Sequence, residues 1–191
     1  MIAPDPKYAS QLTPLEHTYI RRFLEHLAPD ARVLDVGAGG GRFAAAFRAL
    51  HKEIVVDLLD QYPPNPDLIS KDWPGDVIQN DIVTFRPKRT YDAVWMRNVL
   101  FLLPEEAVQP VFHIMTASLR PGGIMDFTML KSDENFKLLT PGLTRQGVAA
   151  LLADNDLTPI LMEERDVPYR SLDGRTLPTF FIQARKARLT A

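Results

Sequence analysis

Residues 33–43 read VLDVGAGGGRF. Apolar residues lead into an acid, glycines then fall at alternate positions, and an alanine-rich stretch follows. This pattern predicts a strand, a tight turn and the start of a helix, because glycine adopts left-handed backbone angles that other residues avoid. Such a turn lets the backbone approach a nucleotide-like ligand closely. A dinucleotide-binding turn needs a third glycine where Arg42 stands, so the spacing disfavours a nicotinamide-dependent dehydrogenase.

The whole chain has the size and composition of one globular domain. It has 191 residues, of which 46% are hydrophobic and 24% charged, and its net charge is −2. This charge gives no general attraction to nucleic acid or to anionic membranes. No apolar stretch approaches the ~20 residues that span a bilayer, and residues 1–6 lack the features of a secretory signal. The sequence contains no cysteine, and its four histidines lack metal-ligand spacing, so we expect a cytoplasmic protein without a metal site.

Helical and strand-like patterns alternate along the chain. Residues 13–16, TPLE, offer an N-cap hydroxyl, a proline at the first helical position and a capping-box glutamate, which predict a helix that continues through Leu27. The first five strands alternate with helical segments and are expected to be parallel, whereas only a loop joins the last two, which are expected to be antiparallel. Further helices are expected over 40–50, 104–119 and 144–153, and strands over 31–36, 53–59, 76–80, 91–96, 124–129, 158–167 and 179–187.

Three motifs occur in the order typical of one enzyme family. A D-x-G-x-G-x-G run spans 35–41, YDAV follows at 91–94, and LRPGG stands at 119–123. They resemble motifs I, IV and V of the class I S-adenosylmethionine-dependent methyltransferases, and the resemblance covers nearly the whole chain. In motif V, a glycine ends the preceding helix in a left-handed conformation. The resemblance implies an α/β fold, a three-layer α/β/α sandwich with seven strands in the order 3-2-1-4-5-7-6 and an antiparallel last strand.

The same resemblance implies the cofactor, S-adenosylmethionine, and where it binds. In the family, the glycine turn passes under the methionine part of the cofactor, which assigns Gly37, Gly39 and Gly41 to this contact. The acid at the position of Asp35 helps to hold the amino group. A carboxylate suits a cationic ammonium and a sulfonium, whereas it would repel a pyrophosphate.

Two further acids follow the next strands. In the family, the acid that ends the second strand binds both ribose hydroxyls, and this position falls on Asp57. A carboxylate accepts two charge-assisted hydrogen bonds from a vicinal diol. Asp60 is the competing assignment, because the apolar run continues to Leu59. After the third strand, Asp81 and Ile82 resemble the family's adenine contact, in which an acid binds the exocyclic amine and the next backbone N–H binds the ring.

Three side chains are candidates for contact with the reacting groups. Arg97 and Asn98 follow the fourth strand at its carboxyl end, where ligands of open α/β sheets bind. Arg97 is a candidate for the cofactor site and for holding an anionic substrate, with a surface ion pair as the alternative. Asn98 is a candidate for orienting a polar nucleophile, with a hydrogen bond to the loop backbone as the alternative. His17 on the first helix is a candidate general base, with an exposed helical histidine as the alternative.

The resemblance implies one domain over residues 1–191. Within it, residues 1–29 are expected to form an N-terminal helical lid, 30–130 the cofactor-binding half and 131–191 the substrate side. The implied reaction is direct in-line methyl transfer to a small-molecule acceptor, releasing S-adenosylhomocysteine. A catalytically silent protein that binds the cofactor or a partner is the alternative hypothesis, because no acid–base pair is evident. The near-neutral charge favours a small molecule over nucleic acid as the acceptor. The chain also lacks the Asn-Pro-Pro-Tyr motif that nucleic-acid and protein amide methyltransferases of the family carry after the fourth strand.

Overall fold

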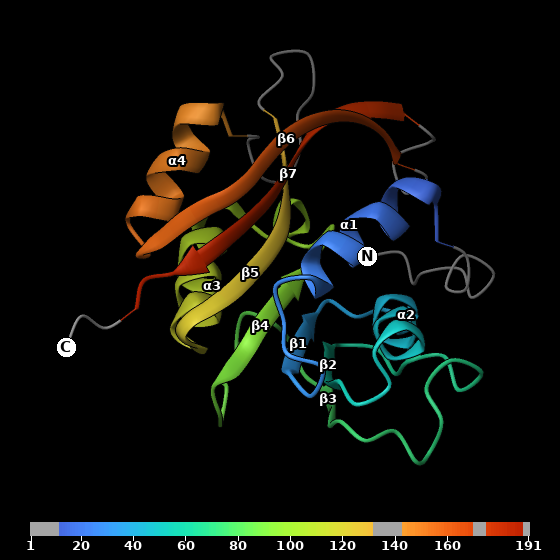
Figure 1. Cartoon of the computed structure of the whole chain (residues 1–191). Helices are drawn as coiled ribbons and strands as arrows, with labels where there is room; N and C mark the ends of the chain where they lie inside the picture. The colour runs from blue at the N-terminus through green and yellow to red at the C-terminus, as the bar shows by residue number, and fades with distance from the viewer. Residues whose placement is uncertain (1–11, 132–142, 170–174, 189–191) are drawn as a thin grey trace.

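A computed structural model describes residues 12–131, 143–169 and 175–188 of the chain. Its centre is one seven-stranded sheet in the order β3-β2-β1-β4-β5-β7-β6 (Figure 1), which confirms the expected order. The first five strands are parallel, and β7 runs antiparallel to both β5 and β6. The strands are β1 (Arg32–Val36), β2 (Val55–Asp60), β3 (Val77–Gln79), β4 (Tyr91–Met96), β5 (Leu119–Leu130), β6 (Leu157–Tyr169) and β7 (Arg175–Lys186).

Helices cover both faces of the sheet, which gives the expected three layers. One face carries two helices near the N-terminus, and the other carries two later helices (Figure 1). None of the described helices is long and apolar enough to cross a membrane. The helical elements are α1 (Pro14–Leu24), α2 (Arg42–Leu50), the short 3₁₀ helix η2 (Leu100–Leu102), α3 (Glu105–Ala117) and α4 (Arg145–Ala153).

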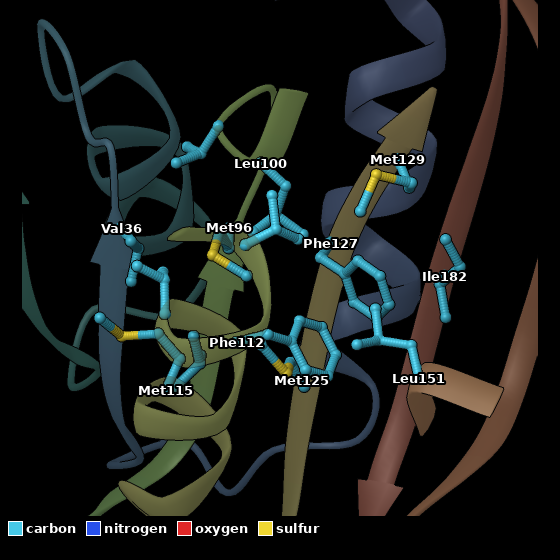
Figure 2. Close-up of a cluster of buried hydrophobic side chains, with 14 of the residues drawn as sticks. Val36, Met96, Leu100, Phe112, Met115, Met125, Phe127, Met129, Leu151 and Ile182 are labelled. Carbon is cyan, nitrogen blue, oxygen red and sulfur yellow. The ribbon is translucent and has the colours of Figure 1, made fainter. Parts of the chain in front are cut away.

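Each face of the sheet buries its own hydrophobic core. Strands with continuous apolar runs fit this arrangement, since they are covered on both sides. The core under α3 and α4 is rich in methionine and aliphatic residues (Figure 2). The core under α1 and α2 is aromatic, and the Trp95 ring centroid lies 4.9 Å from that of Phe23, 5.2 Å from Phe43 and 5.1 Å from Phe47. Such tilted ring pairs hold α1 and α2 against the sheet.

The start of α1 has the geometry that its sequence predicts. The Thr13 N–H donates to Glu16 Oε2 at 2.7 Å, and the Glu16 N–H donates to Thr13 Oγ1 at 3.2 Å. This reciprocal pair is a capping box. The helix ends at Leu24 and not at Leu27, because the next residues form a tighter turn in which the Leu27 N–H donates to the Leu24 carbonyl at 3.0 Å.

The end of α3 differs from the expectation. The helix ends at Ala117, and the prediction that a glycine of the 119–123 motif ends it is wrong. Gly122 does have a left-handed φ of 80°, but it lies within β5, where the pairing with β4 shifts register. Lys186 of β7 binds carbonyls where α3 leads into β5: its Nζ lies 2.9 Å from Thr116 O of the helix and 2.8 Å from Leu119 O of the strand. A cation near a helix C-terminus is favourable.

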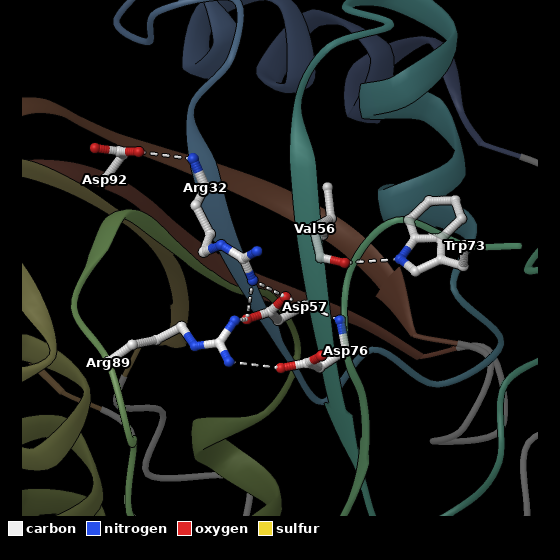
Figure 3. A network of polar contacts seen from close by, with 7 residues as sticks. All are labelled: Arg32, Val56, Asp57, Trp73, Asp76, Arg89 and Asp92. Carbon is white, nitrogen blue, oxygen red and sulfur yellow. Dashed lines mark hydrogen bonds and ion pairs between the residues drawn. The ribbon is translucent and has the colours of Figure 1, made fainter.

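Asp57 lies inside β2, where it forms a buried ion pair (Figure 3). Its side chain is fully buried, and Arg32 Nη1 donates to both carboxylate oxygens, at 2.6 and 2.9 Å. Asp57 Oδ1 also accepts the Asp76 N–H at 3.0 Å, and Arg89 Nη1 lies 3.5 Å from Oδ2. The prediction that Asp57 ends the second strand is therefore wrong, because the strand continues to Asp60.

The segment before β3 packs along the edge of β2. Trp73 Nε1 donates to the Val56 carbonyl at 2.7 Å (Figure 3). A Cβ atom on Gly75 would lie 1.9 Å from the same carbonyl oxygen, so only glycine fits this close approach. These contacts bring the Asp76 backbone beside Asp57 and lead the chain into β3.

We expect the Asp57 ion pair to contribute to stability. Asp57→Asn removes the negative charge opposite Arg32, and breaking a buried pair in this way should lower the free energy of unfolding by ~2–4 kcal/mol. Asp76→Asn is the matched control, because Asp76 and Arg89 form an exposed pair, which should contribute less than ~1 kcal/mol. Urea unfolding of both variants measures the difference, and equal losses would contradict a buried structural role for Asp57.

Candidate functional site

The glycine turn after β1 has three left-handed residues. Gly37, Gly39 and Gly41 have φ angles of 68°, 55° and 84°. The Gly37 N–H donates to the Leu59 carbonyl at 2.8 Å, which ties the turn to β2. A side chain at such angles costs free energy, so the alternating glycines are explained by the turn itself.

The three glycines differ in what faces them. A Cβ on Gly37 would lie 2.3 Å from Val99 Cγ2, and one on Gly41 would lie 2.5 Å from Ile69 Cγ1. A Cβ on Gly39 would have no atom of the described residues within 4 Å. Packing therefore requires glycine at two positions, whereas Gly39 borders open space that a ligand can approach.

Asp60 joins this turn to the end of β2. The Gly39 N–H donates to Asp60 Oδ2 at 2.8 Å, and the Tyr62 N–H donates to Oδ1 at 3.0 Å. Successive residues of a strand point to opposite faces, so Asp57 and Asp60, three residues apart, face opposite sides of the sheet. The side chain of Asp60 is partly exposed and that of Asp57 is fully buried, so the structure brings only Asp60 to the glycine turn.

Asp35 is buried next to the turn without a complete set of partners. It is 1% exposed, and no described residue donates a hydrogen bond to its Oδ2. Burial, followed by the nearby charge of Asp60, raises the pKa of the Asp35 carboxyl to about 7, and Arg42 partly offsets the rise. Because an unsatisfied buried carboxylate is costly, this position favours a ligand that carries a positive charge.

Arg42 connects the turn to α1. Its Nη2 lies 2.6 Å from Glu16 Oε1 and its Nη1 lies 3.2 Å from Oε2, while its guanidinium carbon is 4.5 Å from the Phe43 ring centroid. Glu16 thus caps α1 and pairs with the first residue of α2 at the same time. Arg42, which stands where a dinucleotide-binding turn has its third glycine, therefore holds α1 beside the glycine turn through its ion pair with Glu16.

The segment after β3 lies beside the end of β2. The Asn80 N–H donates to the Asp60 carbonyl at 2.9 Å, and Asp81 follows directly. Asp81 is exposed and its Oδ1 accepts the Val83 N–H at 2.8 Å, which fixes a short turn. Ile82 is partly buried against the core under α3. The structure thus brings the Asp81 region to the same edge as Asp60.

Arg97 lies one residue beyond β4 and is buried. Its side chain is 4% exposed, and its Nε donates to the buried carboxylate of Asp126 in β5. The guanidinium carbon lies 4.7, 4.6 and 4.9 Å from the ring centroids of Tyr19, Trp95 and Phe181. The alternative of a surface ion pair is wrong, because both charged partners are inside the protein.

Asn98 has a left-handed φ of 59°, which asparagine tolerates better than most residues. Its N–H donates to Thr128 Oγ1 at 2.8 Å, and the Thr128 hydroxyl donates to Asn98 Oδ1 at 3.3 Å. These bonds hold the loop after β4 against β5. His17 is exposed on α1, which matches the alternative stated for it.

A family model described as a methyltransferase domain matches residues 8–178. This chain belongs to the methyltransferase-domain family. The prediction of a class I, S-adenosylmethionine-dependent methyltransferase is therefore confirmed at the level of the family. No curated protein matches the sequence.

Solved structures of methyltransferases have the same fold. The 1,6-didemethyltoxoflavin-N1-methyltransferase of Burkholderia thailandensis is 22% identical with a TM-score of 0.71, over 89% of this chain and 77% of that one. The N-methyltransferase NodS of Bradyrhizobium japonicum is 17% identical with a TM-score of 0.72, over 96% and 93%. A SAM-dependent methyltransferase of Methanosarcina mazei is 16% identical with a TM-score of 0.67, over 93% and 99%.

Sequence reasoning missed two residues of this methyltransferase that organise the site. Asp126 holds Arg97, and Glu163 of β6 accepts the Tyr19 hydroxyl at 2.9 Å. The only signal for Asp126 is a single acid in the apolar run of β5, where a charge needs a buried partner. Glu163 stands in a charged stretch of the sequence, so no local pattern distinguishes it from its neighbours.

Two alanine substitutions in the glycine turn compare a packed position, Gly37, with a position that borders open space, Gly39. Gly37→Ala adds a collision with Val99 to a left-handed φ, and should lower the free energy of unfolding by ~2–5 kcal/mol. Gly39→Ala meets no atom and should cost only the backbone term of ~1–2 kcal/mol. Urea unfolding in the absence of ligands measures both losses. A larger loss for Gly39→Ala would contradict the open space assigned to that position.

Proposed function

We propose that this protein binds S-adenosylmethionine at the glycine turn and transfers its methyl group to a small-molecule acceptor. The observation that carries the proposal is the buried Asp35 carboxylate, whose Oδ2 lacks a partner among the described residues, beside a turn whose Gly39 borders open space. An ammonium group would complete the hydrogen bonds of Asp35 and offset the repulsion between Asp35 and Asp60. The residues present therefore suit a cationic adenosyl ligand.

The proposed ribose and adenine contacts lie at the carboxyl ends of β2 and β3. Asp60 is the carboxylate proposed to bind the ribose hydroxyls, in place of Asp57, which Arg32 occupies. Asp81 and the Ile82 N–H are proposed to contact the adenine ring, because the Asn80 backbone is bonded to Asp60. Asp35, Asp60 and Asp81 would then mark the course of one extended ligand across β1, β2 and β3.

When bound, S-adenosylmethionine would supply an activated methyl group: the methyl–sulfur bond would break with its electron pair left on sulfur while a lone pair of the acceptor forms the new bond. The acceptor's proton would pass to bulk solvent after the transfer. The protein's own part is alignment and exclusion of water, and such positioning is worth ~7–11 kcal/mol. We assign no general base, since the leaving group is already activated. Asn98, ordered by Thr128, is proposed to border the acceptor.

We also propose a separate role for each of three segments of the chain. Residues 1–29 would form a lid, 30–130 the cofactor half and 131–191 the acceptor side. The described part of the first segment, α1, packs over the face that carries Asp35 and Arg97. A small-molecule acceptor agrees with the Burkholderia thailandensis relative, which was crystallised with 1,6-didemethyltoxoflavin and S-adenosylhomocysteine.

Calorimetry with S-adenosylhomocysteine tests the proposed site through Asp60. Asp60→Ala removes the charge-assisted hydrogen bonds to ribose and should weaken binding by ~1.5–3 kcal/mol, or roughly 10–150-fold. Asp57→Ala is the control and should leave the affinity nearly unchanged in the folded protein. Absence of binding to the unmodified protein at millimolar ligand would refute the proposal. Release of S-adenosylhomocysteine with pooled small metabolites separates an enzyme from a catalytically silent binder.

The pKa of Asp35 predicts how cofactor binding depends on pH. The ligand's ammonium favours the charged carboxylate, so binding lowers the pKa of Asp35 from about 7 and releases a proton below that pH. The affinity for S-adenosylhomocysteine should rise about tenfold from pH 6 to pH 8 and then level off. Calorimetry in two buffers of different ionisation enthalpy measures the released proton. Asp35→Asn should bind weakly and without this rise, and an unchanged pH profile in that variant would remove Asp35 from the site.

A further inference from the structure

Unpartnered polar atoms gather on the face of the sheet under α1. Asp35, Trp95 and Asp126 are paired side by side on β1, β4 and β5, and Arg97 follows two residues after Trp95, so all four face α1. Asp35 Oδ2, Trp95 Nε1, Arg97 Nη2 and Asp126 Oδ2 are buried and have no hydrogen-bond partner within the described ranges. The ammonium group of the proposed cofactor would supply the missing partner of Asp35. Arg97 is a second buried charge whose hydrogen bonds are incomplete.

The protein holds the Arg97 guanidinium rigidly. Asp126 accepts its Nε–H, and the rings of Tyr19, Trp95 and Phe181 surround it within 4.9 Å. Rings stabilise the cation through their faces without using its N–H groups. A guanidinium has five N–H donors in a planar fork that matches a carboxylate, so donors remain for a further partner.

Asp126 accepts one N–H of this cation and leaves Nη2 without a partner among the described residues. Burial raises the pKa of Asp126, although the charge of Arg97 and the hydrogen bond from its Nε oppose the rise. Because Nη2 of this buried cation has no partner among the described residues, an anion nearby would complete its hydrogen bonds. Arg97 stands immediately after β4, at the carboxyl edge of the sheet, and on the same face as Asp35. An anion bound there would belong to the molecule that lies next to the cofactor.

The face becomes apolar beyond Arg97. Leu130 of β5, Leu177 of β7 and Phe101 of η2 form a small buried cluster, with Val167 of β6 packed against it. Leu130 lies on the same side of β5 as Asp126, four residues further along the strand. These side chains are buried, so aliphatic and aromatic groups lie in the interior beyond the fixed cation.

We propose that the methyl acceptor is a small organic acid, whose carboxylate pairs with Arg97. This inference rests on the proposed methyltransferase function and specifies its acceptor. The nucleophilic atom of the acid must then lie on the part of the molecule that faces the cofactor, since the carboxylate end is fixed by Arg97.

Ligand-detected NMR on protein saturated with S-adenosylhomocysteine tests the proposal. The probes are benzoate and phenylacetate, each compared with its neutral amide, benzamide and phenylacetamide. Each acid should bind the unmodified protein at least tenfold more tightly than its amide. Arg97→Met should abolish this preference by weakening the acids while leaving the amides unchanged, and Arg97→Lys should retain part of it. Arg145→Met is the control, because Arg145 also lies beside a phenylalanine ring but is exposed on α4.

A second variant distinguishes loss of the ligand contact from a folding defect caused by an unpaired buried charge. Arg97→Met with Asp126→Asn removes both charges of the buried pair and should show the same loss of acid preference. Calorimetry should give both variants the affinity of the unmodified protein for S-adenosylhomocysteine, within about threefold. Equal binding of acids and amides by the unmodified protein, including no binding of either, overturns the acid acceptor. A large loss of S-adenosylhomocysteine affinity in the variants also overturns it, because Arg97 would then contact the cofactor. Failure of S-adenosylhomocysteine to bind the unmodified protein would instead refute the proposed function.

Discussion

The hydrogen bond from the Gly39 N–H to Asp60 Oδ2 connects the glycine turn to the end of the neighbouring strand. It forms because β1 and β2 are parallel and in register, with Asp35 opposite Leu58. The same register places the carboxylates of Asp35 and Asp60 close enough to repel each other. A turn built in this way disfavours anionic ligands and favours cationic ones, so its electrostatics separate it from the phosphate-binding turns that its glycines resemble.

Local patterns predicted the elements, because periodicity and capping act over a few residues. The capping box of α1 and the strand–turn–helix around the glycines needed no long-range information. The two acids of β2 are a different case. Their spacing of three residues places them on opposite sides of the sheet, but the apolar residues around them do not indicate which side holds the turn. Only the pairing of the strands decides that Asp57 meets Arg32 and Asp60 meets Gly39.

Contacts between distant segments account for what the sequence could not predict. Arg97 and Asp126 are 29 residues apart, and Lys186 is 70 residues from the Thr116 carbonyl that it caps. A glycine motif near α3 indicated a local helix end, whereas the helix ends before that motif and Lys186 from another strand binds its Thr116 carbonyl. The candidate site has the same character. The proposed cofactor contacts follow a recognisable motif, while the proposed acceptor contacts depend on residues brought together by β4, β5 and β7.

The position of β7 between β5 and β6 has a consequence for how the protein is made. The strand that is last in chain order occupies an interior place in the sheet, and its pairing with β5 spans Ile124–Leu130. During synthesis, β5 keeps an open hydrogen-bonding edge until residue 186 has left the ribosome. An open edge of apolar strand is prone to wrong pairing, and distant strand pairs form slowly. Nascent chains of this protein therefore pass through a stage in which the central sheet is unfinished, and a chaperone that shields β5 would protect them.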